Sequence, residues 1–429
     1  MGRGVLLMSQ KNQQLYDTSF NLMKSDTETN IDLTCPIIPL PVYGSIGFNS
    51  SALKPPLFIN FSNNICTTDH SRANDSYQRH AWYMAGLWWV FYTNDCYLEP
   101  PNLQGLWYRT SSDRINWSAP ATPVVTGAKP DETFNAGIWY SGTYLYYVAG
   151  DGTDVSSPSP NMRWRRGTPN TDGTITWSAA EQSIAPPSGG NAIGSVLWCF
   201  TDVGGNEWII SGRANFANNY VQRNANHDGT WSTNLSHSQA STRLGAVPLP
   251  NGNVTMFWTS ATTPYYHSFS TYNGSTWSPT VTASTYQDYD GISFSAVATI
   301  DNQVHMTYVN GSNKMVYLIY DSISNTILSE AIVPGATPNT NVTIATDSNK
   351  ENTNCFWGDI GAGTYNVIAY LKRTRAGVFS SIARQAYPYS DVFGRGVESW
   401  DDSGGYMFFI FGNTDSGGTG SIILSFWTP

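Results

Sequence analysis

A short polar turn that ends in Trp-Ser recurs along this chain, and its spacing restricts the possible folds more than any other feature. The clearest copy is Asn-Thr-Asp-Gly-Thr-Ile-Thr-Trp-Ser, from Asn170 to Ser178. The tryptophans that end the four copies are Trp117, Trp177, Trp231 and Trp277, at spacings of 60, 54 and 46 residues. A period of about 50 residues is typical of propellers and solenoids, in which each repeat forms one supersecondary unit.

A second pattern repeats together with these turns. Seven runs of aromatic and β-branched residues each follow a glycine or asparagine, at Gly86, Gly142, Gly205, Gly252, Asn302, Gly363 and Gly405. Such runs predict strands that are entered through tight hairpins. Seven copies predict an all-β fold, a seven-bladed β-propeller with four antiparallel strands in each blade. The fifth and sixth repeats lack the tryptophan, and 325–328 and 385–388 are predicted to take its place.

The two ends of the chain are predicted to meet in one blade. The last repeat has room for three strands only, whereas Pro56–Ser62 forms a plausible strand near the beginning. We expect this strand to complete the last blade and close the ring, because closure removes an exposed sheet edge. The predicted domains are an extended N-terminal arm at 1–38 that anchors the protein to an assembly, a connecting segment with the closing strand at 39–75, and the propeller at 76–429.

The composition predicts where such a protein works. Charged residues make up 12% of the chain and its net charge is −9, whereas about 25% charged residues is usual for a globular domain. A surface covered mainly by uncharged polar residues is typical of secreted, cell-surface and virion proteins. The negative charge argues against nucleic acid or an anionic membrane as a partner, and the basic group Arg163, Arg165 and Arg166 is interpreted as a solvated strand edge.

Membrane insertion, metals and cofactors find no support in the sequence. No run approaches the roughly 18 apolar residues of a membrane span. The six histidines show no ligand spacing, and no glycine-rich phosphate loop is present. Of the five cysteines, Cys199 and Cys355 are predicted to be buried free thiols, and a disulfide between Cys35 and Cys66 stays open. Nine Asn-X-Ser/Thr sequences permit glycosylation.

The strand order assigns every loop to one end of the propeller. In each antiparallel blade the Trp turns and the first hairpins share one end, and the remaining loops share the other. The candidate ligand-binding residues at that other end are Asp95, Asp131, Glu132, Asp151, Arg213, Arg243, Asp288, Tyr289, Asp290, Tyr389, Asp391 and Arg395. Carboxylates on different blades, such as Asp131 and Asp290, are a candidate acid/base pair, although aspartates in loops commonly bind backbone amides instead. The tyrosines, together with Trp139 and Tyr140, offer flat apolar surfaces with polar tips, which suit sugars.

The Trp turns resemble the Asp box of sialidases and related propellers, Ser-X-Asp-X-Gly-X-Thr-Trp. In the copy from Asn170 to Trp177, Asp172, Thr176 and Trp177 match, whereas Asn170 replaces Ser and Thr174 replaces Gly. The resemblance implies a folding role, in which the aspartate binds amides of its own turn and the tryptophan packs between sheets. It transfers no catalytic residue, because the arginines, the Tyr/Glu pair and the acidic Asp of a sialidase are not recognisable here.

Three functions follow from these observations. The first is a non-catalytic recognition propeller, extracellular or on a virion surface, that binds a glycan or another surface ligand, while its N-terminal arm binds an assembly partner. The second is a sialidase-like glycoside hydrolase that uses an axial carboxylate pair. The third is a structural subunit of a surface or virion assembly. Fold alone does not decide among them.

Overall fold

In the computed structural model, the chain divides into two compact units, Met1–Ala52 and Leu53–Pro429. The structure describes residues 15–16, 22–23, 57–60, 79–94, 105–114, 116–119, 124–126, 134–151, 162–178, 180–184, 196–212, 219–225, 230–232, 241–260, 262–289, 294–359, 367–386, 397–398, 407–414 and 420–427. In the first unit, the described residues form one antiparallel pair, β1 (Leu15–Tyr16) with β2 (Leu22–Met23). The rest of the predicted anchoring arm lies outside the described residues.

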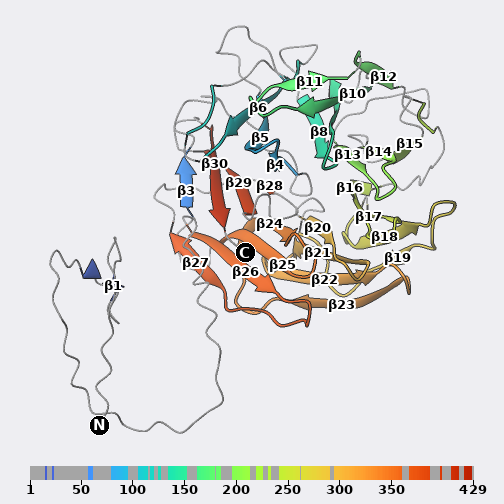
Figure 1. The fold of residues 1–429 in the computed structure, drawn as a ribbon. Helices are drawn as coiled ribbons and strands as arrows, with labels where there is room; N and C mark the ends of the chain where they lie inside the picture. The colour runs from blue at the N-terminus through green and yellow to red at the C-terminus, as the bar shows by residue number, and fades with distance from the viewer. Residues whose placement is uncertain are drawn as a thin grey trace, which may run out of the picture. The chain divides into compact units, whose positions relative to one another are not determined.

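Six sheets of the second unit are made of consecutive antiparallel strands (Figure 1). The first contains β4 (Ala81–Met84), β5 (Leu87–Asn94), β6 (Gly105–Ser111) and β7 (Val125–Thr126). The second contains β8 (Phe134–Tyr140), β9 (Leu145–Asp151), β10 (Met162–Pro169), β11 (Ile175–Trp177) and β12 (Gln182–Ile184). The third contains β13 (Val196–Thr201), β14 (Glu207–Gly212) and β15 (Asn219–Asn224).

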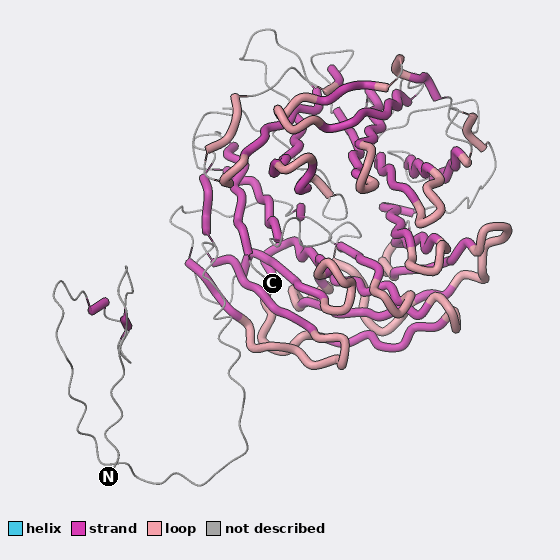
Figure 2. Tube along the Cα trace, viewed as in Figure 1, coloured by secondary structure: helices cyan, strands magenta, loops and turns pink. Residues whose placement is uncertain are grey.

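The next three sheets each have four described strands. The fourth contains β16 (Ser241–Pro248), β17 (Val254–Ser260), β18 (His267–Tyr272) and β19 (Val281–Thr282). The fifth contains β20 (Phe294–Ala298), β21 (Gln303–Val309), β22 (Met315–Asp321) and β23 (Thr326–Ile332). The sixth contains β24 (Pro338–Thr346), β25 (Thr353–Asp359), β26 (Val367–Arg373) and β27 (Ala383–Ala386). No helix occurs in the described part of the chain (Figure 2).

A seventh, composite sheet joins the two ends of this unit. Its strand order is β28 (Val397–Glu398), β29 (Met407–Thr414), β30 (Gly420–Trp427) and β3 (Leu57–Asn60). β3 runs antiparallel to β30, with Leu57 opposite Phe426 and Asn60 opposite Ile423. The expected closure by a strand from the beginning of the chain is therefore confirmed, with six blades of consecutive strands and a seventh, composite blade.

From the second blade to the seventh, the first strand of each blade contacts the first strand of the next, as in a propeller. β8 contacts β13, β13 contacts β16, β16 contacts β20, β20 contacts β24, and β24 contacts β28. These contacts place the first strands around one axis and the later strands further out (Figure 1). The predicted all-β propeller class is confirmed.

Large aromatic side chains fill the space between the sheets. Trp82, Trp89, Trp198, Trp208 and Trp357 are all at most 1% exposed. Full burial of a side chain of this size stabilises the fold by several kcal/mol, and the edge-to-face and stacked aromatic contacts add to this. The free cysteines Cys199 and Cys355 are also buried, as expected.

In each Trp turn the serine after the tryptophan binds the third strand of its blade. Ser178 does so by donating both its N–H and its Oγ–H to Arg166 O, and the other serines form a reciprocal pair of hydrogen bonds. In the fourth sheet, Ser278 N–H donates to Thr271 O at 2.8 Å, and Thr271 N–H donates to Ser278 Oγ at 3.0 Å. The same reciprocal pair joins Ser118 with Thr110, Ser232 with Arg223, and Ser380 with Lys372. The serine thus ties each turn to the third strand of its blade.

The pair at Ser380 corrects the prediction for the sixth repeat. Phe379 precedes Ser380 and forms an antiparallel bridge with Arg373, as Trp277 does with Tyr272. Phe379 therefore occupies the tryptophan position, whereas Gln385 and Ala386 of the predicted replacement lie in β27. The sequence pattern missed this turn because Phe replaces Trp, and a packed aromatic ring is what the position requires.

The turn from Asn170 to Trp177 shows how an aspartate holds such a loop. Asp172 Oδ1 accepts hydrogen bonds from Thr174 N at 2.9 Å and from Thr174 Oγ1 at 2.7 Å. These bonds favour the charged carboxylate and hold the pKa of Asp172 below its ordinary value. Gly173 adopts a φ of +82° at the tightest point of the turn, a conformation that glycine adopts without strain.

Candidate functional site: an axial cavity with aromatic and basic walls

The described residues of all six consecutive-strand sheets line a cavity of about 770 Å³ on the propeller axis. All six consecutive-strand sheets contribute to its wall, through the ends of their first strands and the hairpins that follow. The hairpins of neighbouring blades are joined there, because Asn251 N–H donates to Asn302 Oδ1 and Ile300 N–H donates to Lys350 O, each at 2.9 Å. The cavity therefore lies at the end of the ring where the first hairpins meet.

The Trp turns lie at this same end. Arg375, in the turn that ends at Phe379, donates to Asp301 at 2.6 Å and to Glu351 at 3.1 Å, and both acceptors belong to first hairpins. The cavity is therefore at the opposite end from Asp288 and Tyr289, the two sequence candidates that are described with their side chains.

One hairpin of the second sheet shapes a large part of the wall. Between β8 and β9, Ser141 N–H donates to Tyr144 O at 3.0 Å, and Tyr144 N–H donates to Ser141 Oγ at 3.1 Å. Gly142 has a φ of +94°, which allows the reversal in so few residues. Tyr140 Oη donates to Gly142 O at 2.7 Å and braces the loop. The hairpin is thus held rigidly while Tyr144 stays 37% exposed.

Aromatic faces form the apolar part of the cavity. Trp139 is held by its Nε1–H, which donates to Thr201 Oγ1 at 3.1 Å, and by an edge-to-face contact with Phe200. Its orientation is therefore determined by the third sheet. The other aromatic residues of the wall are Trp82, Tyr83, Tyr140, Tyr144 and Tyr146. Of the residues proposed from sequence as sugar-stacking surfaces, Trp139 and Tyr140 lie here.

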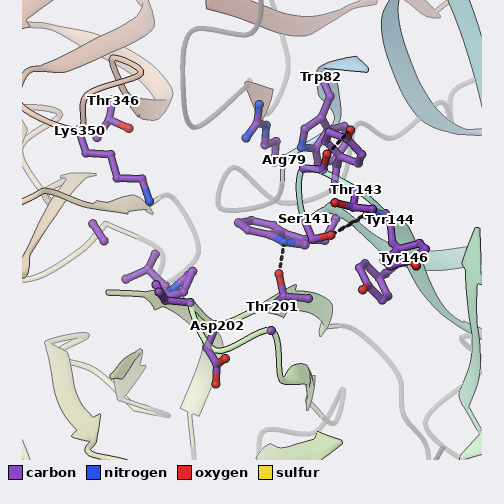
Figure 3. Close-up of a pocket in the computed structure, with 18 of the residues that line it drawn as sticks. Arg79, Trp82, Ser141, Thr143, Tyr144, Tyr146, Thr201, Asp202, Thr346 and Lys350 are labelled. Carbon is purple, nitrogen blue, oxygen red and sulfur yellow. Dashed lines mark hydrogen bonds between the residues drawn. The ribbon is translucent and has the colours of Figure 1, made fainter. Parts of the chain in front are cut away.

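Three basic side chains share this wall: Arg79, Arg166 and Lys350. The Arg79 guanidinium lies 5.0 Å from the Trp82 ring, and its Nε donates to Ala81 O at 3.0 Å. Arg166 lies 4.7 Å over the Tyr144 ring. Lys350 extends toward the middle of the cavity (Figure 3). Arg166 was interpreted from sequence as part of a solvated strand edge, and the structure instead brings it to the cavity.

Asp202 is the acidic residue of the described lining, and its carboxylate is engaged in its own hairpin. Oδ1 accepts from Asn206 N at 2.9 Å, and Oδ2 accepts from the buried Trp208 Nε1 at 2.9 Å. In Figure 3 the carboxylate points away from Arg79 and Lys350. The role that these bonds define for Asp202 is the stabilisation of the turn.

Tyr140 and Tyr146 of the wall keep their protons at neutral pH. Burial raises the pKa of Tyr140. Burial and, to a smaller extent, the negative charge of Glu207 raise the pKa of Tyr146. Both phenols are therefore hydrogen-bond donors and acceptors, and Tyr146 is not activated as a nucleophile. The cavity combines aromatic faces, neutral hydroxyls and positive charges, a set suited to binding.

The structure describes few of the candidate residues selected from sequence. Asp288 and Tyr289 are described with their side chains, and Asp151 and Arg243 only as positions in β9 and β16. The candidates outside the described residues are Asp95, Asp131, Glu132, Arg213, Asp290, Tyr389, Asp391 and Arg395. Tyr289 is 56% exposed. A ligand site at that end of the propeller stays a prediction.

Asp288 lies in the packing between the fourth and fifth sheets. Its Oδ2 is 3.2 Å from His267 Nε2, and both side chains are fully buried. The His267 ring packs against Phe294 and Tyr308. Tyr308 Oη donates to Glu330 at 2.6 Å. Burial is the larger cause of the raised pKa of Tyr308, and this hydrogen bond is the second. This buried polar network joins two blades.

The described residues contain no group of three His, Cys, Asp or Glu side chains placed to hold a metal ion. Within the same residues, no helix has the length and apolar character needed to span a membrane.

Comparison with known proteins identifies the fold. No protein-family model and no curated protein sequence matches this chain. A polysaccharide lyase described as an ulvan lyase has a similar structure, with 10% identity, coverage of 83% of this chain and 94% of the lyase chain, and a TM-score of 0.51. The class that these observations define is a β-propeller.

Lectins and sialidases are also among the similar structures. The six-bladed fungal lectin of Aleuria aurantia is 12% identical, with coverage of 75% of this chain and 98% of the lectin and a TM-score of 0.45. A Trypanosoma rangeli sialidase is 10% identical, with coverage of 86% of this chain and 57% of the sialidase and a TM-score of 0.43. This chain therefore spans little more than half the length of that sialidase. The propeller fold that the resemblance of the Trp turns implied is the fold of this chain.

Proposed function

We propose that this protein is a non-catalytic glycan-recognition propeller and that the axial cavity is its saccharide site. The observation that carries the proposal is the wall itself, in which rigidly held aromatic rings alternate with hydroxyl and cationic donors. Sugars present apolar C–H faces and hydroxyl groups, so they are bound by stacking and hydrogen bonding together. A volume of about 770 Å³ suits a ligand of a few sugar rings, since small-molecule sites commonly measure about 300–1,000 Å³.

The side chains of the cavity wall are preorganised for binding. Trp139 is oriented by Thr201, and the Tyr144 hairpin is held by Ser141 and Tyr140. Preorganised side chains lose little conformational freedom when a ligand binds, which favours affinity. The low charge content of the chain, 12%, supports display outside a cell or on a virion surface as part of this proposal.

The hydrolase alternative has less support. Glycoside hydrolysis generally needs two carboxyl groups about 5–10 Å apart. In the described lining, Asp202 is the one acidic residue, and its oxygens are bound by Asn206 and Trp208. The structural-subunit alternative predicts no saccharide affinity and is tested by the same experiment.

A glycan array followed by calorimetry tests the proposal with two matched variants. Tyr144→Ala removes an exposed ring at the cavity, and Tyr289→Ala removes an exposed ring near the other end of its blade. We expect Tyr144→Ala to weaken binding by about tenfold, since one stacked aromatic ring is commonly worth about 1 kcal/mol or more, and Tyr289→Ala to leave it unchanged. Loss of binding only in Tyr289→Ala would move the site to the opposite end, and no binding to any glycan would refute the function.

A further inference from the structure

We infer that the axial cavity selects acidic saccharides, those that carry a carboxylate or a sulfate group. This inference rests on the proposed glycan-binding function and specifies its ligand class. It starts from a difference in charge between the whole chain and the cavity lining. The whole chain contains 31 acidic and 22 basic residues, whereas the described cavity lining contains the three basic residues Arg79, Arg166 and Lys350 and one acidic residue, Asp202.

Two carboxylates lie beside these basic side chains, and neither faces the cavity. The Asp202 carboxylate points out of the cavity into bonds with Asn206 and Trp208. Glu207 lies behind the wall, 2% exposed, and is 3.9 Å from Arg166. Counting these two carboxylates against the three cations leaves one net positive charge among these described residues. An anionic group entering the cavity is attracted by this local field, which low-dielectric walls strengthen.

The two arginines are held in fixed orientations at the wall. Arg166 lies over the Tyr144 ring at 4.7 Å, and Arg79 lies over the Trp82 ring at 5.0 Å. A guanidinium carries its donors in a planar fork, which suits the two-pronged hydrogen bonding that carboxylates and sulfates accept. The same rings present the apolar surface on which a sugar stacks. One ligand with a sugar ring and an acidic substituent uses both features.

Lys350 completes the site from the sixth sheet. It lies at the end of the β24–β25 hairpin, where its backbone has a φ of +58° and its carbonyl accepts from Ile300 N–H. The hydrogen bond fixes the base of the side chain, while the amino group extends toward the cavity (Figure 3). Because the left-handed backbone also suits asparagine, Lys350→Asn removes the charge without straining the hairpin.

The test is calorimetric titration of the full chain with matched saccharides. The probes are lactose, lactose sulfated at one hydroxyl, cellobiose, the corresponding glucuronic-acid disaccharide, and sodium sulfate alone. We expect the acidic member of at least one pair to bind about tenfold more tightly than the neutral one, the effect of one charge-assisted contact. Lys350→Asn removes most of that preference and leaves the affinity for the neutral member within about twofold.

Lys314→Asn is the matched control, because Lys314 is an exposed lysine in the hairpin between β21 and β22, at the other end of the fifth blade. It should retain the full preference for acidic sugars. Equal affinity for neutral and acidic members would overturn the inference and leave the glycan-binding function intact. A preference that survives both Lys350→Asn and Arg79→Gln, or equally tight binding of sulfate alone, would also overturn it. Absence of binding to every saccharide would overturn both the inference and the function.

Discussion

Gly167 lies directly against Trp177 across two neighbouring strands, so close that a Cβ atom on Gly167 would come within 2.6 Å of Trp177 Cε3. Because Gly167 has no side chain, it leaves the space that the Trp177 ring occupies. Trp177 also makes an edge-to-face contact with Tyr147 at a centroid distance of 5.3 Å. Both contacts lie within the second blade, and Trp177 also packs against a buried cluster that the first and second sheets share, which fits the packing between sheets that the resemblance implied.

Gly167→Ala is therefore expected to lower the free energy of unfolding by about 1–3 kcal/mol, because the added methyl group must displace the indole ring. Chemical denaturation measures the change. Gly311→Ala is the control, since a Cβ there meets the flexible end of Gln287 at 3.2 Å, and it should change stability by less than about 1 kcal/mol. Equal effects of the two substitutions would contradict close packing of the Trp177 ring against Gly167.

Removal of the closing strand is expected to open the ring. A chain that starts at Leu53 keeps β3, whereas one that starts at Ser62 lacks it and leaves β30 as an unpaired edge. We expect the shorter chain to unfold about 5–10 °C lower and to self-associate, because an open strand edge pairs with other chains. Calorimetry and light scattering provide the measurements. Identical melting and monomeric behaviour of both chains would argue against closure by β3.

Asp202→Ala is expected to destabilise the fold by about 1–3 kcal/mol, because the buried Trp208 Nε1–H loses its acceptor. Asp321→Ala is a matched change in another turn, where the carboxylate binds the exposed Ile323 and Ser324, and should cost less than about 1 kcal/mol. Urea unfolding measures both. If the Asp202 variant is as stable as the wild type but no longer binds saccharide, the carboxylate belongs to the ligand site and not to the turn.

The free energy of unfolding is expected to decrease as the pH is lowered below about 6.5, the ordinary histidine pKa. Burial lowers the pKa of His80 to about 4. Burial, and to a smaller extent the Arg373 charge, lower the pKa of His305 to about 3. The unfolded chain therefore binds protons at these groups first, so their contribution to stability is complete above pH 6.5 and is lost as the pH falls toward the folded values.

Each histidine adds a slope of up to about 1.4 kcal/mol per pH unit in that window. Urea titrations between pH 6.5 and 5 measure it in the wild type and in His305→Gln, whose amide can still bond to Tyr317, the partner of His305 Nδ1 at 2.6 Å. We expect a shallower slope in the variant. The same slope in both proteins would show that His305 is not held neutral in the folded state.

Local sequence determined the strands and their closure into a ring. Hairpin glycines, alternating aromatic runs and the Trp-Ser turns are short-range signals, because turn geometry and strand pairing depend on residues close in the chain. The strand near Pro56 was predictable for the same reason, since the last repeat lacked one. The turn at Phe379 was not predicted, although Ser380 follows it as in the other copies, because the repeated pattern contains tryptophan and the position requires only a packed aromatic ring.

Tertiary structure alone decided which side chains share the axial cavity. Arg79 and Lys350 are 271 positions apart in the sequence, and nothing in their neighbourhoods distinguishes them from solvated surface residues. They line the same cavity because the propeller places the first hairpin of every consecutive-strand sheet at one end of its axis. Such convergence depends on long-range packing and on the sum of the twists between blades, which no local pattern encodes.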